Sequence, residues 1–541
     1  MYLLENPVLQ RELLVNLRMT RAFVLLFAYL AALGGVVYMA WPQDTVLDLT
    51  RNPDASRRLI NLFFLGQFLL ASMMTPSFAA GSITGEKERK TYEMLLASPL
   101  RPGAIVLGKL LASLTHLAVL IFCSLPIVML CLPLGGVSLY EVLAAYLALI
   151  LAVLVFGMIS LAASSYFHRT SASLVVSYMV ILPLAVAGAA FWNNMESQGP
   201  LRLLLSVTLL PAVCGIIALV LFAQTSRRLL HPPDVGSEGK DVVDLDVEAE
   251  QAVGLVIRRD QFPDRLFAPP KRNDLLADGA NPIYDKEMRS EIFSQGTLML
   301  RLVIQISMFL AVPMMAVCLF IRSHMAPWYM SYVVVFNMLV GPVFSAGSVT
   351  SERERQTLDL LLTTIITPGQ ILWGKLLSGL RVSSVLTLFL LWPLVLSVLA
   401  PVGFWDNLPT ICGYTLVVLL TCLTTSVTAL FCSVVVQKTS TSLMLTYLVI
   451  LVLFGAPLAA AFFASTFFPT SAALGWVSAA GISSPFVALF NLPLDVDMPG
   501  IDPRQGNLPL FIWFCFFALA YNAVLLVTMS WLFKTRWRVA D

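Results

Sequence analysis

Long apolar stretches alternate with short polar ones along the whole chain. A helix that crosses a bilayer needs ~20 mostly apolar residues, because only a helix or a closed barrel satisfies its own backbone hydrogen bonds in hydrocarbon. This rule predicts twelve spans, six in each half of the chain. They lie at 22–41, 59–80, 104–132, 141–166, 171–192 and 203–225, and at 298–321, 329–347, 371–400, 409–435, 441–465 and 510–533. The pattern therefore predicts an all-α integral membrane protein.

Two polar stretches interrupt this series of spans. Residues 226–280 hold eleven acids and eight bases, and we interpret them as a cytoplasmic linker that is too short for a nucleotide-hydrolysing domain. Residues 466–509 are rich in proline and too broken to cross the membrane, so we expect a capping or re-entrant segment on the outer face. The predicted organisation is therefore a six-span module at 1–225, the linker, and a second six-span module at 281–541.

Positive charge collects on one side of the predicted spans. The connection at 81–103 holds four Lys or Arg residues, whereas the next connection, 133–140, holds none. In the second half Arg353 and Arg355 lie in the corresponding connection, and 401–408 again holds no base. Short loops rich in Lys and Arg stay on the cytoplasmic side. We therefore expect a multi-pass protein of the cytoplasmic membrane with both termini in the cytoplasm.

Composition narrows the class of protein further. The chain is 58% hydrophobic and 12% charged, whereas soluble domains carry about 25% charged residues. This excludes a cytosolic enzyme, a disordered scaffold and a disulfide-stapled secreted module. The net charge of +2 provides no basic field for nucleic acid. The eight cysteines lie singly with no CxxC pair and the four histidines are scattered, so we expect no metal site.

The two halves of the chain repeat each other. Residues 76–111 align without gaps on 342–377, with 19 identities in 36 positions. Two further blocks recur in the same order, namely Asn6-Pro7 as Asn281-Pro282, and Arg169-Thr170-Ser171 as Lys438-Thr439-Ser440. Since each half holds an even number of spans, both halves enter the membrane in the same direction. The sequence therefore predicts a parallel repeat with a pseudo-two-fold axis along the membrane normal.

The strongest repeated block is the polar segment after the second span of each half. Its candidate site residues are Glu86, Glu88, Arg89 and Thr91, repeated as Glu352, Glu354, Arg355 and Thr357. We expect the acids in the first turn of one short helix, where the helix dipole favours negative charge. Tyr92, Leu95 and Leu96 would form its apolar stripe. This favours an amphipathic helix that docks a partner on the cytoplasmic face; the alternative is an ordinary interfacial loop obeying the positive-inside rule.

A second repeated block precedes the first span of each half. Its residues are Asn6, Pro7, Arg11 and Glu12, repeated as Asn281, Pro282, Lys286 and Glu287. Asn at an N-cap followed by Pro at the first helical position is a typical helix start. A stripe of apolar residues follows at a spacing of four, so we expect an amphipathic helix lying along the membrane surface. A plain helical extension of the next span fits the same pattern.

Several catalytic arrangements are excluded. The stretch from Gly103 to Leu110 nearly spells a phosphate-binding loop, but Leu110 replaces the Ser or Thr that would hold Mg²⁺, and no strand precedes it. The predicted spans hold no Asp or Glu well inside them, whereas ion-driven carriers usually keep such groups. We therefore expect no catalytic residues, no cofactor and no energy source within this chain.

The stretch from Thr84 to Pro99 resembles the cytoplasmic-loop signature of ABC-2 type transporter permeases, with its Glu-x-Glu-Arg, Thr, Leu-Leu and Pro. The resemblance covers both halves and implies two fused permease modules. It also implies that the two repeated segments are coupling helices for two copies of a separate ABC ATPase, which would bind the ATP and Mg²⁺. The second copy departs in one place, because Ile365 occupies the position of Pro99.

We therefore predict the membrane permease of an ABC transporter, working as an exporter in the lipid bilayer. One alternative is a non-transporting membrane anchor for a cytoplasmic ATPase, since the same docking segments would serve it. Another is a secondary carrier, which would need ion-coupling groups that the spans do not supply. The transported substrate does not follow from the sequence, because every polytopic protein has apolar spans.

Overall fold

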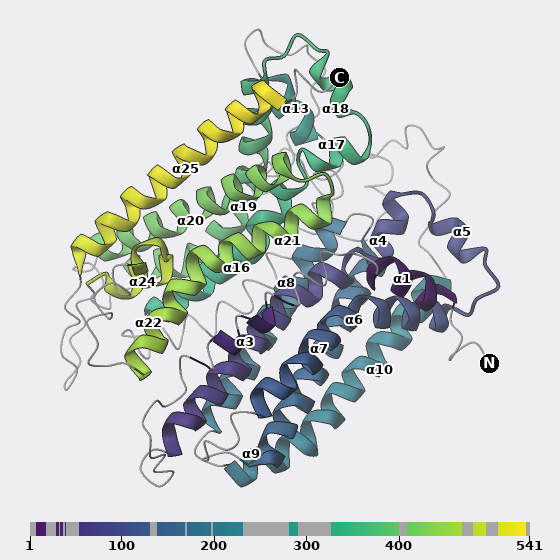
Figure 1. Ribbon diagram of the computed structural model, residues 1–541. Coiled ribbons are helices and arrows are strands. Elements are labelled where there is room, and N and C mark those ends of the chain that lie inside the picture. The colour runs from purple at the N-terminus through teal and green to yellow at the C-terminus, as the bar shows by residue number, and fades with distance from the viewer. Residues whose placement is uncertain are drawn as a thin grey trace. The chain divides into compact units, whose positions relative to one another are not determined.

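The fold was analysed in a computed structural model of the 541-residue chain. The structure describes short pieces between 27 and 38 together with residues 7–17, 53–129, 138–167, 170–195, 199–230, 281–289, 326–399, 408–467, 480–493 and 507–536. The chain divides into two compact units, Met1–Val235 and Gly236–Asp541, each treated by itself below. Throughout these described ranges the regular structure is helical, with no strand (Figure 1).

Each unit is a bundle of long helices with a few short ones at its ends. Unit 1 contains α1 (Pro7–Leu17), α3 (Pro53–Ala79), α4 (Gly81–Glu88), α5 (Tyr92–Leu96), α6 (Pro102–Met129), α7 (Leu139–Tyr166), α8 (Thr170–Asn194), α9 (Gly199–Val207) and α10 (Leu209–Leu230). Unit 2 contains α13 (Pro282–Arg289), α16 (Ala326–Ala346), α17 (Thr350–Glu354), α18 (Leu358–Leu362), α19 (Pro368–Leu399), α20 (Leu408–Val435), α21 (Thr439–Ile450), a π-helical turn (Leu451–Gly455), α22 (Ala456–Phe467), a 3₁₀ turn (Gly481–Ser483), α24 (Pro485–Asn491) and α25 (Leu508–Arg536).

Ten helices among the described residues are long and apolar enough to cross a membrane. They are Phe63–Glu88, Pro102–Met129, Leu139–Tyr166, Thr170–Trp192, Pro200–Leu229, Ala326–Glu354, Pro368–Trp392, Leu408–Val435, Thr441–Ala461 and Leu508–Phe533. Of the predicted spans, 298–321 lies outside the described residues and 22–41 lies mostly outside them, as does the linker 226–280. The all-helical membrane protein is therefore confirmed, whereas the total of twelve spans stays a prediction.

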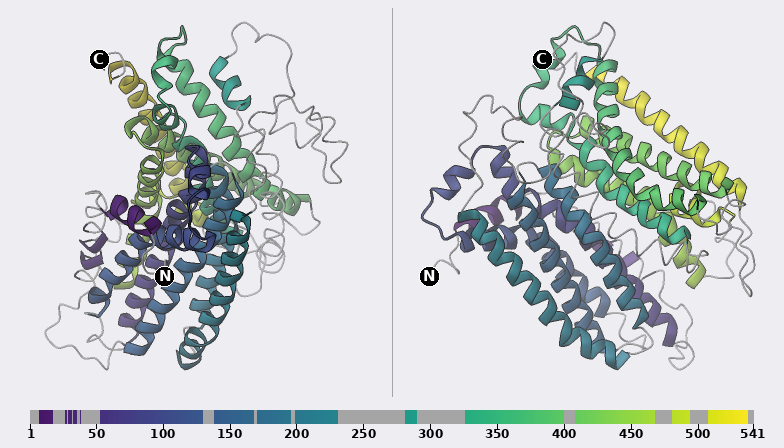
Figure 2. Two further views of the ribbon diagram at one scale, coloured as in Figure 1. Left: turned by 90° about the vertical axis from the view of Figure 1, so that its right-hand side faces the viewer. Right: turned by 180° about the vertical axis from the view of Figure 1, so that it is seen from behind.

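One central helix organises each unit. In unit 1, α7 packs against α3, α6, α8 and α10, and α6, α7 and α10 lie side by side in each view (Figures 1 and 2). A Cβ built on Gly157 of α7 would lie 2.8 Å from Cδ2 of Leu114 on α6, so glycine permits this close approach. In unit 2, α20 takes the same place, between α16, α19, α21 and α25. Each central helix therefore packs against four other helices of its unit.

The described part of 466–509 covers the end of the π-helical turn. Ser483 Oγ donates to the Leu453 carbonyl and Ser484 Oγ donates to the Phe454 carbonyl, both at 2.8 Å. A π-helical turn displaces the regular hydrogen-bond ladder and leaves such carbonyls available. The short helix α24 also packs on α16 and α20. Whether this segment re-enters the membrane stays a prediction.

Unit 2 has a polar cluster around Asn337 that unit 1 does not repeat. The Asn337 amide on α16 donates to Ser383 (3.1 Å), Thr387 (3.0 Å) and Cys422 (3.0 Å), and it accepts from Thr425 (3.0 Å). By the alignment of the repeats, unit 1 carries apolar residues at these positions, which are Ala71, Leu117, Ile121, Val153 and Phe156. Interhelical hydrogen bonds of this kind hold membrane helices together. Asn337 therefore joins α16, α19 and α20 of unit 2.

We expect Asn337→Leu to lower the free energy of unfolding by about 1–3 kcal/mol, because it removes four interhelical hydrogen bonds. The measurement is thermal unfolding of the purified chain in detergent. The control is Thr415→Val on α20, since the Thr415 hydroxyl donates only to the Ile411 carbonyl of its own helix. Equal unfolding temperatures of Asn337→Leu and Thr415→Val would contradict this role of Asn337.

Candidate functional site

The repeated polar segment is a sharp turn between two short helices, which we call the Glu-Arg turn (residues 81–96 and 347–362). In unit 1 it joins α4 to α5, and in unit 2 it joins α17 to α18. Lys90 and Gln356 each have φ of 57° and reverse the chain. The sequence placed both acids of each copy in the first turn of a single helix. For unit 1 this was wrong, because Glu86 and Glu88 end α4 and the chain turns after them.

The spacing of Glu and Thr in the motif follows from this turn. The Thr91 amide donates to the Glu86 carbonyl (3.0 Å), and the Thr357 amide donates to the Glu352 carbonyl (2.9 Å). Such a bond across a left-handed residue is the closing bond of a Schellman helix end. The Thr91 and Thr357 hydroxyls also donate to the carboxylates of the same two glutamates. Glu and Thr five residues apart therefore fix the shape of the turn.

The start of each turn is bound to the central helix of its unit. Ser164 Oγ on α7 accepts from the amides of Ile83 (3.1 Å) and Thr84 (2.9 Å). Ser433 Oγ on α20 accepts from the amides that correspond to these in unit 2, those of Val349 (3.0 Å) and Thr350 (3.1 Å). The first amides of a helix have no partner within it, so an outside acceptor stabilises this end.

The charges of the motif cap neighbouring helices. Lys87 donates to the carbonyls of Ser165 (2.7 Å) and Phe167 (3.0 Å) at the end of α7, and Arg353 donates to the corresponding carbonyls at the end of α20. Glu88 accepts from the Thr170 amide (2.8 Å) at the start of α8, as Glu354 does from Thr439 (3.0 Å) at the start of α21. Bases at helix ends and acids at helix starts match the helix dipole.

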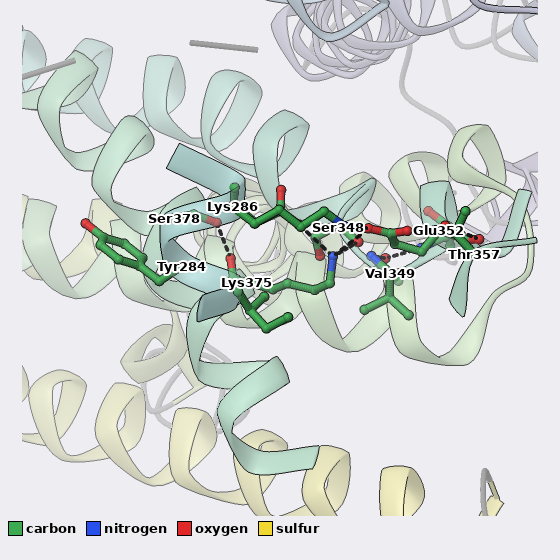
Figure 3. A network of polar contacts seen from close by, with 12 residues as sticks. Tyr284, Lys286, Ser348, Val349, Glu352, Thr357, Lys375 and Ser378 are labelled. Atoms are coloured by element: carbon green, nitrogen blue, oxygen red, sulfur yellow. Dashed lines mark hydrogen bonds and ion pairs between the residues drawn. The ribbon is translucent and has the colours of Figure 1, made fainter. Parts of the chain in front are cut away.

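A buried lysine lies beneath each turn. In unit 2, Lys375 of α19 is 1% exposed, and its ammonium donates to the Ser348 carbonyl (2.7 Å) and the Glu287 carboxylate (2.8 Å) and lies 3.7 Å from Glu352 (Figure 3). In unit 1, Lys109 of α6 is 3% exposed and donates to the Ser82 carbonyl (2.8 Å). It lies 3.3 Å from Glu86 and 3.6 Å from Glu12. Each lysine therefore joins the turn, its own long helix and the short helix α1 or α13.

Sequence reasoning missed these two lysines. Lys109 and Lys375 lie within the repeated block, but the sequence assigned neither of them a contact with the turn. The structure places them inside α6 and α19, bound to the turn, and this arrangement leaves no loop around a phosphate. The repeat itself was the available signal, because an identical lysine in two apolar segments is unusual for packing alone.

The short helices of the second repeated block, α1 and α13, pack against α6 and α19, the helices that carry the two lysines. That these short helices are amphipathic and lie along the membrane surface stays a prediction. α1 begins at Pro7 and α13 at Pro282, while Asn6 lies outside the described residues. Asn281 caps α13 by accepting from the Ile283 amide (3.0 Å). A Cβ on Gly374 of α19 would lie 3.0 Å from the Tyr284 amide nitrogen, so glycine lets α13 approach closely.

Contact between α13 and the turn is direct. Lys286 lies 3.0 Å from the Glu352 carboxylate, which Lys375 also approaches (Figure 3). Glu352 is therefore shared between the base of α13 and the base of α19. In unit 1, Arg11 of α1 is exposed, and its positive charge favours the ionised form of Glu86, as the charge of Lys286 does for Glu352.

The predicted acids divide between the two faces of the turn, because Glu88 and Glu354 are exposed whereas the other two are not. Glu86 and Glu352 point into the turn and are largely buried. Arg89 and Arg355 are exposed, as are Glu93 and Asp359 on the short helices. The side chains of Met94 and Leu360, which occupy the same place in the repeat, are 76% and 68% exposed. Sequence reasoning missed Met94 and Leu360. The available signal was their position two residues after Tyr92 and Leu358, because residues two apart on a helix lie on different faces.

We expect Ser433→Ala to lower the free energy of unfolding by about 1–3 kcal/mol, because the amides of Val349 and Thr350 lose their acceptor. Ser164→Ala should act similarly in unit 1. The control is Ser160→Ala, since this buried hydroxyl donates to a carbonyl of its own helix. The measurement is thermal unfolding in detergent. Indistinguishable curves for Ser433→Ala and Ser160→Ala would show that the hydroxyl does not hold the turn.

The family of the chain is established by sequence comparison. A family model described as ABC-2 family transporter protein matches residues 7–199 and 275–536. The two matched regions contain both Glu-Arg turns, both buried lysines, and the short helices α1 and α13. No curated protein matches the chain. The chain therefore belongs to the ABC-2 transporter family of multi-pass membrane proteins.

Proposed function

We propose that the chain is the membrane permease of an ABC exporter, with two modules fused in one polypeptide. Separate ABC ATPase subunits, one for each module, bind ATP and Mg²⁺ and dock on the two Glu-Arg turns. The termini and the turns face the cytoplasm, and α1 and α13 lie along the membrane surface. The observation that carries this proposal is the repeated turn, whose inner contacts are matched residue by residue between the units.

Docking uses the outward residues of each turn. Met94 and Leu360 each present an exposed apolar side chain next in sequence to an exposed acid, which is Glu93 or Asp359. The same turn also exposes an arginine, which is Arg89 or Arg355. An exposed apolar side chain among charged residues is suited to a small pocket on a partner, because a few such buried anchors contribute much of the binding free energy of an interface. The outward surface is short, so the ATPase pocket need accept only one helical turn.

The acids of the motif shape this surface from inside. Glu86 and Glu352 accept from Thr91 and Thr357 and face the buried lysines. Glu88 and Glu354 cap the following long helix. A movement of the turn is thereby transmitted to the central helix, to the helix after it, and through the lysine to α6 or α19. The turn is thus suited to convert a movement of the ATPase into a movement of the spans.

A membrane anchor for a cytoplasmic ATPase would use the same docking face. It differs in that no substrate would cross the bilayer when ATP is hydrolysed. ATP-dependent movement of a labelled compound into or out of vesicles that contain the chain and its ATPase separates the two functions. Exporter function requires movement away from the side that holds the ATPase.

The first test concerns docking. We expect the double variant Met94→Ala, Leu360→Ala to retain the unfolding temperature of the parent but to recover about tenfold less of the ATPase on co-purification, because both apolar anchors are lost. The control is Leu139→Ala, an exposed apolar residue at the other end of α7. Equal recovery of the ATPase with parent and double variant would contradict docking on α5 and α18.

Glu86→Gln and Glu352→Gln test the inner role of the acids. Each variant replaces a carboxylate that faces a buried lysine with an uncharged amide, so the ammonium group loses a counter-ion. We therefore expect a lower unfolding temperature as well as weaker recovery of the ATPase. This joint effect distinguishes shaping of the turn from direct contact with the ATPase. Unchanged stability with reduced recovery would instead show that the two carboxylates contact the ATPase themselves.

A third test concerns the energy source. We expect the purified chain, freed of partner subunits, to hydrolyse no ATP, because Lys109 and Lys375 are bound within helices and do not reach a phosphate. The measurement is phosphate release with and without the co-purifying ATPase. Release by the isolated chain that disappears in Lys109→Met or Lys375→Met would overturn the assignment of hydrolysis to partners.

A further inference from the structure

Two cations of unit 1 meet at the end of α7. Lys87 of α4 donates to the carbonyls of Ser165 (2.7 Å) and Phe167 (3.0 Å), the two residues that flank Tyr166. The guanidinium of Arg228, in the last turn of α10, lies over the ring of Tyr166 itself, with Cζ 3.2 Å from the ring centroid. The two positive charges repel each other. Two like charges are therefore gathered around one residue.

Neither charge has a carboxylate partner in the part of the chain that the structure describes. Glu86 and Glu88, on either side of Lys87, are used by the contacts with Lys109 and with the start of α8. Arg228 forms no hydrogen bond within the same described ranges. A base that only caps a helix donates to the last carbonyls of that helix, and Arg228 does not. An unpaired guanidinium held beside a second cation indicates a ligand with negative charge.

The stacking of Arg228 on Tyr166 orders the guanidinium for such a ligand. The ring of Tyr166 is 51% exposed, so the stacked pair lies at the surface of unit 1, and of the three guanidinium nitrogens only Nε is buried. A planar guanidinium presents parallel N–H groups that match two oxygens of one phosphate. The ammonium of Lys87 is already bonded to carbonyls at the end of α7, so it contributes charge rather than a hydrogen bond.

The surface that leads to this pair is apolar. Val213, Ile216, Leu219 and Val220 of α10 are exposed, and α10 belongs to a helix long and apolar enough to cross a membrane. Arg228 follows them in the last turn, and a spanning helix ends where the lipid head groups begin. A molecule that has a phosphate at Arg228 and apolar chains along α10 finds a partner at both ends. Those are the two parts of a phospholipid.

We propose that Arg228, stacked on Tyr166 and reinforced by the charge of Lys87, binds the phosphate of an anionic phospholipid whose acyl chains lie on the exposed face of α10. The lipid supplies the counter-charge that the two cations lack. Unit 2 has no equivalent site, because Val435 stands at the position of Tyr166 and offers no aromatic face. Since Lys87 belongs to α4, the lipid stabilises the Glu-Arg turn of unit 1 alone.

The first test compares two lipids that share a phosphate. The full chain is stripped of lipid in dodecyl maltoside, and binding of dioleoylphosphatidylglycerol and dioleoylphosphatidylcholine is measured by native mass spectrometry. We expect phosphatidylglycerol to bind at least about fivefold more tightly, because each base at the membrane surface favours an anionic lipid. The choline group, in contrast, brings a further cation to Lys87 and Arg228. Equal binding of the two lipids would overturn the proposal.

Variants at the end of α10 locate the binding. Arg228→Gln should weaken binding of phosphatidylglycerol by about fivefold and leave binding of phosphatidylcholine unchanged. The matched control is Arg227→Gln, which removes the same charge from the exposed neighbour, about 100° around the helix, and should weaken binding by less than about twofold. Equal losses in the two variants would show a diffuse basic surface and overturn the site.

Tyr166→Val tests the stack without a change of charge. It introduces the residue that unit 2 carries at this place, and the side chain it removes is exposed, so we expect the variant to fold even if Arg228→Gln does not. Binding of phosphatidylglycerol should weaken, because the guanidinium loses the surface that orders it. Binding equal to that of the parent would contradict a site built on the stacked pair.

A final arm separates a lipid from a soluble phosphate of the same chemistry. Glycerol 3-phosphate at the concentration of the lipid should not displace phosphatidylglycerol, because it cannot use the apolar face of α10. Displacement would assign the site to a soluble phosphate compound and overturn the lipid. All of these measurements use the chain without ATPase or ATP, so their outcome does not depend on the proposed function.

Discussion

The structure depends on the pairing of a buried ammonium group in each unit. An unpaired charge inside a low-dielectric bundle is strongly destabilising, and removal of one partner from a buried ion pair typically costs about 3–5 kcal/mol. Lys375 is therefore constrained to keep the Ser348 carbonyl and the Glu287 carboxylate at hydrogen-bond distance, with Glu352 close by. These three groups come from the turn and from α13. A single cation on α19 thus fixes where two otherwise peripheral elements lie.

The remaining contacts of the turn extend this constraint to the rest of the unit. Ser433 holds the start of the turn on α20, and Glu354 connects it to α21. With the lysine on α19, these contacts link three long helices to one short surface segment. Because each contact is repeated in unit 1, the same mechanical arrangement occurs twice in one chain. Arg89, Arg355, Met94 and Leu360 are exposed, so the turn has a solvent-facing surface besides the contacts that hold it to the long helices.

The sequence predicted much of this arrangement because it rests on local and repeated features. The apolar stretches predicted the long helices, and Asn281 followed by Pro282 predicted where α13 begins. The repeat located both turns by itself. The inward direction of Glu86 and Glu352 could not be predicted, since helical spacing does not say which carboxylate meets a lysine of another helix. The role of Ser164 is likewise a contact between distant segments, and this residue belongs to no recognisable motif.

The most direct measurement of the central claim is amide hydrogen exchange in the parent and in Lys375→Met. If one buried cation holds both elements, α13 (Pro282–Arg289) and the turn (residues 347–362) will exchange faster together, while the middle of α20 keeps its protection. Unchanged exchange in both segments would contradict the account. Faster exchange in only one of them would also contradict it, because the two elements would then be held independently.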